Sequence, residues 1–413
     1  MNKAAAVKAG WQTKTLADVC EFSNGLWKGE KPPFVNVGVI RNTNFTKEGA
    51  LDDSDIAYLD VEVRKFEKRR LQLGDVILEK SGGGPKQPVG RVVLFDIAEG
   101  DFSFSNFTSA LRVLEPDSLD FRFLHKFLHW TYLSGVTEGM QSHSTGIRNL
   151  DGDAYKAIEI AFPELSEQQR IVGILDAAFD GISTAKANAE RNLQNARALF
   201  ESHLQSVFTQ RGERWVERTL NDVCKQITDG KHGDCTGEDC SGYYFLSAKD
   251  VRGGTLNYEG ARQITRADFE ETHRRTDLEP GDILVTNSGT IGRLAIAPSD
   301  DRTSRTTFQK SVAILKPLRT AIDSRFAFHC LSSGLARFVN LSAGTAQKNL
   351  LLRDLRAYRL ALPQSVDQQQ LLGIKLDALS AETQRLESLY HQKLAALDAL
   401  KKSLLDQAFT GAL

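Results

Sequence analysis

The chain has 413 residues, of which 41% are apolar and 25% charged, the composition of an ordinary globular protein large enough for two domain cores. No apolar run approaches the roughly 20 residues that span a bilayer, and the start lacks the apolar core of a signal peptide, so we expect a cytoplasmic protein. The 52 basic and 53 acidic residues leave a formal charge of −1, so any nucleic-acid site must be a local basic region.

The most informative feature of the sequence is an internal repeat. Matching segments occur in the same order in both halves: TLADVC at 15–20 with TLNDVC at 219–224, LQLGDVIL at 71–78 with LEPGDILV at 278–285, SALRVLEP at 109–116 with SVAILKP at 311–317, and AIEIAFP at 157–163 with YRLALP at 358–363. The first pair is offset by 204 residues (219 − 15). A period of about 200 residues is too long for a solenoid, so we predict a duplicated two-part unit with a pseudo-twofold relation.

The first part of each repeat is rich in short β-type segments. Apolar runs at 76–78 and 283–285 are bounded by glycine-rich turns such as the one at 81–84. Helices are predicted at 121–133 and 324–339. The pattern is typical of an α+β protein with two mixed β-sheet domains.

The second part of each repeat is predicted to be one long helix. Ser166 with Gln169, and Ser365 with Gln368, have the spacing of a capping box at a helix start. Both segments carry the four-three spacing of a coiled-coil seam, which we interpret as a buried packing surface. The seam residues are Ile171, Leu175, Ala178, Ile182, Ala185 and Ala189, then Leu372, Leu376, Leu379, Leu386, Leu397 and Leu404. About 45 residues make a rod of roughly 65 Å, and two such rods should pack side by side; if antiparallel, they place the two domains at opposite ends.

Several apparent catalytic motifs fail on inspection. KPPF at 31–34 has a lysine where the NPPF tetrapeptide of amino-methyltransferases has its asparagine, and we interpret it as a proline turn. Asp75 with Glu79 and Lys80 resembles a nuclease cluster, but the second copy keeps only Asp282, so a turn aspartate before a buried strand is favoured. No phosphate-binding GxxxxGK[ST], HExxH or GxSxG motif occurs, and we expect no catalysis by this chain alone.

The five cysteines are an odd, widely spaced set, which argues against a disulfide scaffold. The nearest approach to a metal site is His232, Cys235 and Cys240, with Cys224 as a further candidate ligand. Paired CxxC knuckles are missing, so we expect a loop with free thiols and no metal.

Longer motifs recur around these elements: FPELSEQQRIV at 162–172 with LPQSVDQQQLL at 362–372, GDVILEKSGGG at 74–84 with GDILVTNSGTIGR at 281–293, and a terminal SLLDQAFTGAL at 403–413. In this order and in duplicate they resemble the specificity subunits of type I restriction-modification systems. The resemblance covers nearly the whole chain beyond about Trp11. One departure is that the second glutamine cluster begins with Asp367 where the first has Glu167.

The resemblance implies a division into an N-terminal tail (1–14), a target recognition domain (15–165), a central helical repeat (166–212), a second target recognition domain (213–363) and a distal helical repeat (364–413). Such subunits are not catalytic. Each recognition domain reads one half of a split sequence in double-stranded DNA, and the subunit binds two adenine-N6 methyltransferase subunits and motor-nuclease subunits. S-adenosylmethionine, magnesium and ATP belong to those partners, so no cofactor is expected on this chain.

Sequence-specific DNA binding needs side chains that bond to base edges and others that grip phosphates. Two loop pairs offer them on glycine-flanked frames, at 80–91 with 287–293 and at 142–149 with 342–349. The candidate DNA-binding residues are Lys80, Lys86, Gln87, Arg91, His143, Thr145 and Arg148 in the first repeat, and Asn287, Ser288, Thr290, Arg293, Thr345, Gln347 and Lys348 in the second. Two alternatives stay open: an assembly scaffold with two protein-binding domains and no DNA contact, and a zinc-dependent hydrolase around His232.

Overall fold

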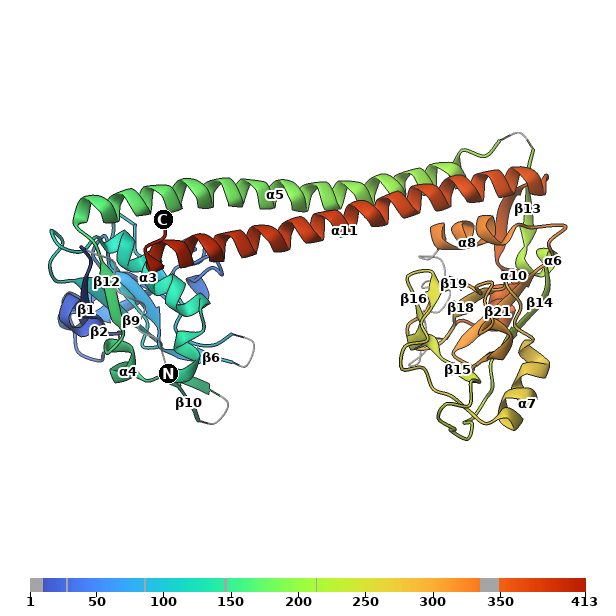
Figure 1. Cartoon of the computed structure of the whole chain (residues 1–413), viewed down its shortest axis with the longest axis horizontal. Coiled ribbons are helices and arrows are strands. Elements are labelled where there is room, and N and C mark those ends of the chain that lie inside the picture. Colours follow the sequence, from blue (N-terminus) through green and yellow to red (C-terminus); the bar gives the residue numbers. More distant parts are fainter. Residues whose placement is uncertain (1–9, 27–28, 85–86, 145–146, 213, 335–348) are drawn as a thin grey trace. The chain divides into compact units, whose positions relative to one another are not determined.

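A computed structural model of the chain describes residues 10–26, 29–84, 87–144, 147–212, 214–334 and 349–413 (Figure 1). The chain divides into two compact units, one formed by Met1–Ala189 with Gln392–Leu413 and the other by Glu190–His391. Each unit contains a β domain and a stretch of both long helices. In the described part of the chain, no helix is long and apolar enough to cross a bilayer.

The first unit is a mixed β domain built on a central four-stranded antiparallel sheet. The strand order of this sheet is β2 (Cys20–Asn24), β9 (Thr108–Val113), β5 (Val76–Glu79) and β7 (Val92–Leu94). A second sheet, in which β3 and β8 are parallel, contains β4 (Ala57–Glu62), β3 (Phe34–Ile40) and β8 (Phe102–Phe104). The remaining strands are β10 (Gln141–Ser144), β11 (Ile147–Leu150) and β6 (Ser81–Gly83) in a third sheet, and the pair of β1 (Gln12–Thr15) with β12 (Glu159–Phe162).

The second unit repeats this plan. Its central sheet has the same order, with β14 (Cys224–Asp229), β21 (Val312–Pro317), β18 (Ile283–Thr286) and β19 (Leu294–Ile296). The other strands are the parallel pair β15 (Tyr244–Leu246) and β20 (Thr306–Phe308), the hairpin of β16 (Val251–Arg252) and β17 (Thr255–Leu256), and the pair β13 (Trp215–Thr219) and β22 (Arg359–Pro363). The predicted duplication and the predicted α+β class are confirmed.

The short helices also recur in both units. They are α1 (Leu16–Val19), α2 (Val63–Glu67), α3 (Phe121–Leu133) and α4 (Gly152–Lys156) in the first, and α6 (Leu220–Val223), α7 (Arg266–Thr276), α8 (Ser324–Ser333) and α10 (Leu352–Ala357) in the second. The helix predicted at 121–133 is confirmed. Its counterpart begins at Ser324 as predicted but ends at Ser333, where Gly334 caps it; residues 335–339 of that prediction lie outside the described residues.

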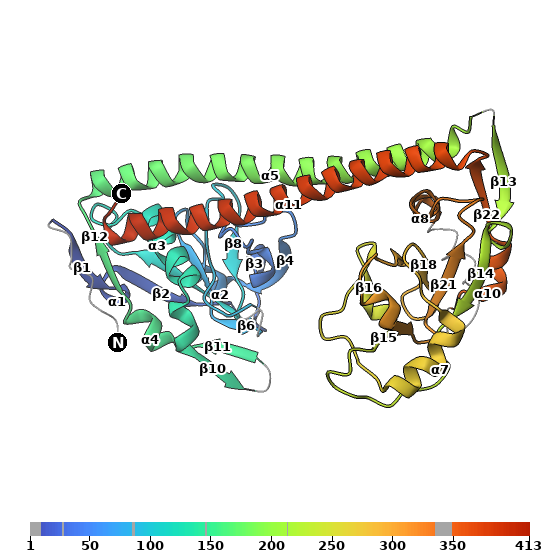
Figure 2. The ribbon, with the colours of Figure 1, turned by 45° about the vertical axis from the view of Figure 1, so that its right-hand side comes forward.

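Helix α3 carries the core of the first unit. Asp120 caps it by accepting hydrogen bonds from the backbone of its first turn, and Phe123 and Leu124 on its buried face pack against the central sheet. Figures 1 and 2 show α3 between that sheet and the long helices. Each fully buried side chain of this size stabilises the fold by about 1.5–3 kcal/mol.

The long helices are α5 (Leu165–Thr209) and α11 (Val366–Thr410). In the first unit they run antiparallel, because Arg170 donates to the carbonyl of Leu413 at 3.3 Å and Lys186 pairs with Asp398 at 2.8 Å. In the second unit Arg197 pairs with Glu387 at 2.9 Å. Ile171, Leu175, Ile182 and Ala189 of the predicted seam are buried, as is Leu376. The other seam residues are half-buried. The seam is therefore a packing surface, as predicted.

A buried glutamine fastens the start of each long helix to its β domain. Nε2 of Gln168 donates to the carbonyls of Ser118 and Pro163 at 2.8 Å each, and its Oε1 accepts from the backbone N–H of Asp120 at 2.8 Å. Gln369 does the same with Ala321 (3.2 Å), Pro363 (2.8 Å) and Asp323 (2.9 Å). Both glutamines are 0% exposed. The glutamine clusters are thus clamps, and they match at an offset of 201 residues (369 − 168), so Gln368 and not Asp367 is the counterpart of Glu167.

The two capping predictions have different outcomes. Helix α5 begins at Leu165, so Ser166 lies inside its first turn and donates to the side chain of Glu164 at 2.9 Å. The capping box predicted at Ser166 is therefore wrong. Ser365 precedes α11 and its hydroxyl accepts from the N–H of Gln368 at 3.4 Å, which is the helix-capping half of that prediction.

Candidate nucleic-acid interface

In the first unit the two loops that the sequence singled out form one small sheet. Strand β6 of the glycine-rich loop pairs with β11 of the β10–β11 hairpin, and Ser81 Oγ donates to Asn149 Oδ1 at 2.6 Å (Figure 2). The N–H of Leu150 also donates to the carbonyl of Lys80 at 2.8 Å. Two segments about 70 residues apart in the chain therefore meet at the end of β5.

The second unit brings its equivalent loops together in the same way. Ser288 forms a β-bridge with Asn349, and the N–H of Leu350 donates to the carbonyl of Asn287 at 2.8 Å. The two loop pairs were found separately in the sequence. The fold unites each of them at one edge of its β domain.

A glycine corner next to these loops was not identified from the sequence. A Cβ on Gly25 would lie 1.7 Å from the carbonyl oxygen of Ser105, and one on Gly230 would lie 2.0 Å from that of Phe308, so only glycine fits either position. The corner places Asn24 against the candidate loop, where its Oδ1 accepts from Lys80 Nζ at 2.8 Å. The self-comparison contained the signal, since Asn24-Gly25 recurs as Asp229-Gly230.

Lys80 is half-buried at this corner, and the loss of hydration lowers the pKa of its ammonium group. Its one hydrogen bond to a described residue is to a neutral amide. The positive charge is therefore not cancelled by a described carboxylate, which suits a group that meets a phosphate.

Arg91 has a different environment. Its guanidinium donates to both carboxylate oxygens of Glu79, at 2.7 and 2.9 Å, and to the carbonyls of Phe45 and Asn42 at 3.0 and 3.1 Å. Gln87 lies against it and, with its amide oxygen turned inward, accepts from it at 2.7 Å. Because the Glu79 side chain is only 2% exposed, this ion pair is internal. The structure therefore gives Arg91 a supporting role within the domain, with its guanidinium held by internal partners.

The ion pair of Arg91 with Glu79 lines a pocket of about 430 Å³. The pocket is lined by residues of the loop after β3 and of the glycine-rich loop: Asn42, Thr43, Phe45, Lys47, Glu79, Gly82, Gly83, Gly84, Gln87 and Arg91. Lys47 was not among the predicted site residues, because nothing in its local sequence separates it from an ordinary surface lysine.

Arg148 lies on β11, paired across the hairpin with His143, and its Nη1 donates to Gln141 Oε1 at 3.3 Å. The side chain of Arg148 is half-buried. Lys86 and Thr145 lie outside the described residues, as does the side chain of His143. The structure therefore leaves these three side chains without a described position.

In the corresponding site of the second unit, the arginine forms fewer internal hydrogen bonds to described residues than Arg91 does. Thr286 occupies the position that Glu79 has in the first unit. In the described part of the chain, no carboxylate forms an ion pair with Arg293. The Nη1 atom of Arg293 is 3.5 Å from the carbonyl oxygen of Ala248. Thr290 is exposed. Asn287 is 7% exposed, and its Oδ1 has no hydrogen-bond partner among the described residues.

Asn287 and Ser288 line a pocket of about 340 Å³ together with Asp229, His232, Lys310 and the segment 349–352. The predicted residues Thr345, Gln347 and Lys348 lie outside the described residues. Asp229, His232 and Lys310 are therefore the neighbours that sequence reasoning did not assign to this interface.

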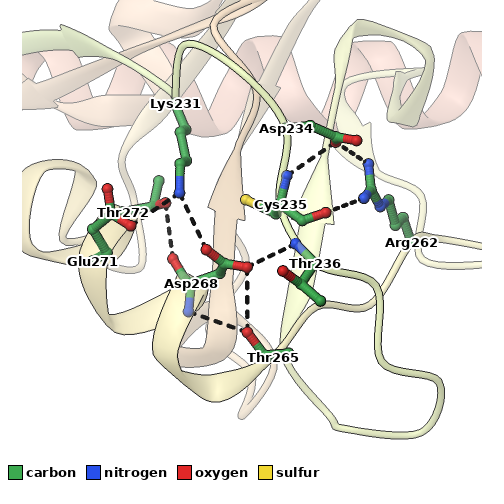
Figure 3. Close-up of polar contacts among 9 residues, drawn as sticks. All are labelled: Lys231, Asp234, Cys235, Thr236, Arg262, Thr265, Asp268, Glu271 and Thr272. Atoms are coloured by element: carbon green, nitrogen blue, oxygen red, sulfur yellow. Dashed lines mark hydrogen bonds and ion pairs between the residues drawn. The ribbon is translucent and has the colours of Figure 1, made fainter.

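The loop after β14 is tied to α7 by a polar network (Figure 3). Lys231 Nζ lies 3.2 Å from Asp268 Oδ1 and 3.0 Å from Glu271 Oε2, and the N–H of Thr236 donates to Asp268 Oδ2 at 2.7 Å. The bond from Thr236, with the nearby Lys231 charge, lowers the pKa of Asp268 to about 2. The network ties the loop that carries His232 to α7.

The structure of this loop also shows where the candidate zinc ligands lie. Cys235 is buried with Phe245, Ile264 and Phe269, while His232 is exposed and bonds to Asp229 at 3.3 Å. Within the described ranges, no three His, Cys, Asp or Glu side chains are grouped as a metal site would need. The four candidate ligands therefore do not converge.

Asp75, which resembles part of a nuclease cluster in the sequence, and its counterpart Asp282 stabilise the fold through internal hydrogen bonds and ion pairs. Asp75 accepts from the N–H of Gln72 at 2.8 Å and pairs with Arg112 at 2.7 Å. Asp282 accepts from Glu279 at 2.9 Å and pairs with buried Lys316 at 2.7 Å. Each aspartate closes the turn before a central strand and neutralises a base on the adjacent strand.

Comparison with known proteins gives one consistent family. The family of type I restriction modification DNA specificity domains matches residues 8–192 and 212–395. The chain is similar to the EcoBI specificity subunit of Escherichia coli (24% identity over 350 residues, 76% of this chain and 72% of the relative) and to the EcoKI specificity subunit of Escherichia coli K12 (22% identity, 99% and 90%). Its fold is similar to that of a chain in a structure reported for complex assembly and conformational transition of the type I R-M system, with a TM-score of 0.77, 17% identity, and 99% and 100% of the two chains covered.

Proposed function

We propose that this chain, which belongs to the family of type I restriction-modification DNA specificity subunits, reads a split DNA sequence through the paired loops at the edge of each β domain. It is a non-catalytic subunit with two target recognition domains. We assign these domains to residues 15–165 and 213–363, preceded by a tail at 1–14 and followed by the helical repeats 166–212 and 364–413. Each recognition domain reads one half-site.

The observation that carries this proposal is the convergence of the same two loops in both units. In each unit the glycine-flanked loop that follows β5 or β18 pairs with the second candidate loop. The glycine corner at Gly25 or Gly230 lies next to this junction. Of the described candidates only Asn287 is buried. Unlike Arg91, whose guanidinium is paired with Glu79, the other described cations of the set form no ion pair with a described carboxylate; the partly exposed candidates without such a pair are Lys80, Gln87 and Arg148 in the first unit and Ser288, Thr290 and Arg293 in the second. Their donors suit phosphate and base-edge contacts.

The residues Lys86, Gln87, Arg91, His143, Thr145, Asn287, Thr345, Gln347 and Lys348 complete the proposed interface. Arg91 and Gln87 contribute indirectly, because their hydrogen bonds fix the loop that carries Gly82. This division separates residues that touch DNA from residues that position the loop.

The partners follow from the family. Two adenine-N6 methyltransferase subunits and motor-nuclease subunits assemble with the chain, and S-adenosylmethionine, magnesium and ATP bind to those partners. The complex acts in the cytoplasm. Accordingly, the isolated chain should neither bind S-adenosylmethionine in calorimetry nor methylate or cut DNA, while addition of the methyltransferase subunit should produce methylation.

A domain exchange tests the function directly. Replacing residues 15–165 with the equivalent domain of another such subunit should change one half of the methylated motif and leave the other half unchanged. Sequencing of N6-methyladenine in strains with the original, exchanged and deleted gene reads out the motif. A folded exchange complex that alters both halves or neither refutes the assignment of one domain to one half-site.

Salt dependence separates this function from a protein scaffold that does not touch DNA. The affinity of the assembled complex for duplex DNA should fall steeply with salt, because each neutralised phosphate releases counterions. An affinity that is unaffected by salt, or no DNA binding at all, contradicts the proposal.

A further inference from the structure

We propose that Phe107 is an apolar base-contacting residue of the first recognition domain. The inference rests on the DNA-reading function proposed above. It adds a residue to the interface that neither the loop pattern nor the repeat indicates, since Phe107 lies outside both candidate loops.

The backbone of Phe107 is fixed where the two candidate loops meet. The residue lies in the turn between β8 and β9, which is closed by hydrogen bonds from the N–H and the hydroxyl of Thr108 to the carbonyl of Ser105, at 2.9 and 2.8 Å. The carbonyl of Phe107 accepts from the N–H of Lys80 at 3.0 Å and from that of Ser81 at 3.2 Å. The turn is therefore fastened to the junction of β5 and β6.

The ring of Phe107, by contrast, is open to solvent. The residue is 42% exposed, whereas Phe104, three positions earlier, and Thr108, the next residue, are buried. Gly82 of the candidate loop has a φ of +103°, and a Cβ there would lie 3.6 Å from Cδ1 of Phe107. Glycine at this position provides the loop conformation, and a side chain there would lie in van der Waals contact with the ring of Phe107.

The second unit shows that the turn does not need an aromatic side chain. The carbonyl of Ser311 accepts from the N–H of Asn287 at 3.0 Å, as that of Phe107 accepts from Lys80. The Ser311 hydroxyl accepts from the N–H of Ala248 at 3.2 Å, so this side chain is turned toward the protein. Glu79 pairs with Thr108 and its counterpart Thr286 with Val312, so Ser311 corresponds to Phe107, and the sequence pairing of Ser109 with Ser311 is wrong by two residues. The same backbone position therefore carries an exposed phenylalanine in one domain and a half-buried serine in the other.

The chemistry of the ring defines what it would contact. A phenyl group cannot pair with phosphate, and the apolar parts of DNA are the thymine methyl group and the faces of unstacked bases. Phe107 sits beside Lys80, whose charge can hold the neighbouring phosphate backbone. We therefore assign to Phe107 an apolar contact with a base of the first half-site.

The experiment compares Phe107→Ser, which installs the residue found in the second unit, with Phe107→Leu. The matched control is Leu73→Ser. Leu73 is 62% exposed in the same unit, and it lies before the start of β5, whereas Phe107 contacts the residues that follow the end of β5. Each variant is assembled as the full chain with its methyltransferase subunits. Its methylation motif is sequenced, and its affinity for a duplex carrying the wild-type motif is measured by fluorescence anisotropy between 50 and 200 mM salt.

Phe107→Ser should weaken binding by about 5- to 150-fold, the range for loss of an aromatic–base contact. The slope of log affinity against log salt should stay unchanged, since no phosphate contact is removed. Sequence relaxation should be confined to the first half-site, with Phe107→Leu intermediate and Leu73→Ser like wild type.

Wild-type affinity and motif in Phe107→Ser would overturn the inference, as would a shallower salt slope or relaxation of both half-sites. Equal losses in Leu73→Ser would also overturn it, because they would reflect general loss of an apolar surface. A wild-type complex that neither binds nor methylates DNA refutes the proposed function itself, and so distinguishes the two failures.

Discussion

Replacing the buried glutamine clamps should destabilise each unit separately. Gln168→Met keeps the approximate volume of the side chain but removes the hydrogen bonds to Ser118, Pro163 and Asp120. At about 1 kcal/mol per bond the loss is about 3 kcal/mol, and the buried N–H of Asp120 left without a partner raises the upper limit to about 5 kcal/mol. For a unit of this size, a loss of 3 kcal/mol corresponds to a fall in Tm of about 6–12 °C.

The neighbouring glutamines provide the control. Gln169 and Gln370 are exposed, so Gln169→Met and Gln370→Met should change the free energy of unfolding by less than about 0.5 kcal/mol. Hydrogen exchange with mass spectrometry during urea unfolding reports each unit through its own peptides. Gln168→Met should release the first unit early and Gln369→Met the second.

The reasoning would be refuted if Gln168→Met were no more harmful than Gln169→Met, since the three hydrogen bonds would then contribute nothing net. A loss shared equally by both units would also refute it. That result would mean that the clamp stabilises something other than the junction of its own helix with its own β domain.

The remaining predictions concern pH, the internal ion pair and the long helices. Burial lowers the pKa of His125 to about 4 and of His129 to about 3. The unfolded chain therefore binds protons below about pH 6.5 that the native first unit does not, and stability falls on acidification by about 2 kcal/mol per ring between pH 7 and pH 5. Denaturation of His125→Asn and His129→Asn variants should show a weaker pH dependence, and an unchanged one contradicts the assignment. Glu79→Ala should cost about 3–5 kcal/mol because it leaves the Arg91 guanidinium without its carboxylate, and the Glu79→Leu/Arg91→Leu pair should recover part of the loss in the same assay; no recovery would argue against that cause. One heptad added to both α5 and α11 lengthens each helix by about 10 Å, so the sequenced methylation motif should gain about three unspecified base pairs between its half-sites; an active complex with an unchanged spacer shows that the helices do not set this distance.

The duplication, the α+β class and the long helices could all be predicted from the amino-acid sequence. These features are written as periodic or repeated local patterns: the 204-residue offset between TLADVC and TLNDVC, the β-type runs before the glycine turns, and the seam through Ile171, Leu175 and Ile182 (219 − 15 = 204). Periodicity of this kind reports which face of an element is buried without requiring knowledge of its neighbour. The candidate loops were found for the same reason, because they recur in both halves.

The partners of the polar side chains could not be predicted from the sequence and became clear only from the folded chain. Glu79 pairs with Arg91 across the ends of β5 and β7, Gln168 reaches back to Asp120, and Gly82 lies beside the ring of Phe107. None of these pairings has a fixed sequence spacing, since each depends on how strands distant in the chain are placed side by side. The one-residue shift between the glutamine clusters has the same origin. The sequence motifs align Glu167 with Asp367, but the buried residues that correspond are Gln168 and Gln369. Their side-chain amides bond to the end of the preceding strand and to the cap of the neighbouring helix.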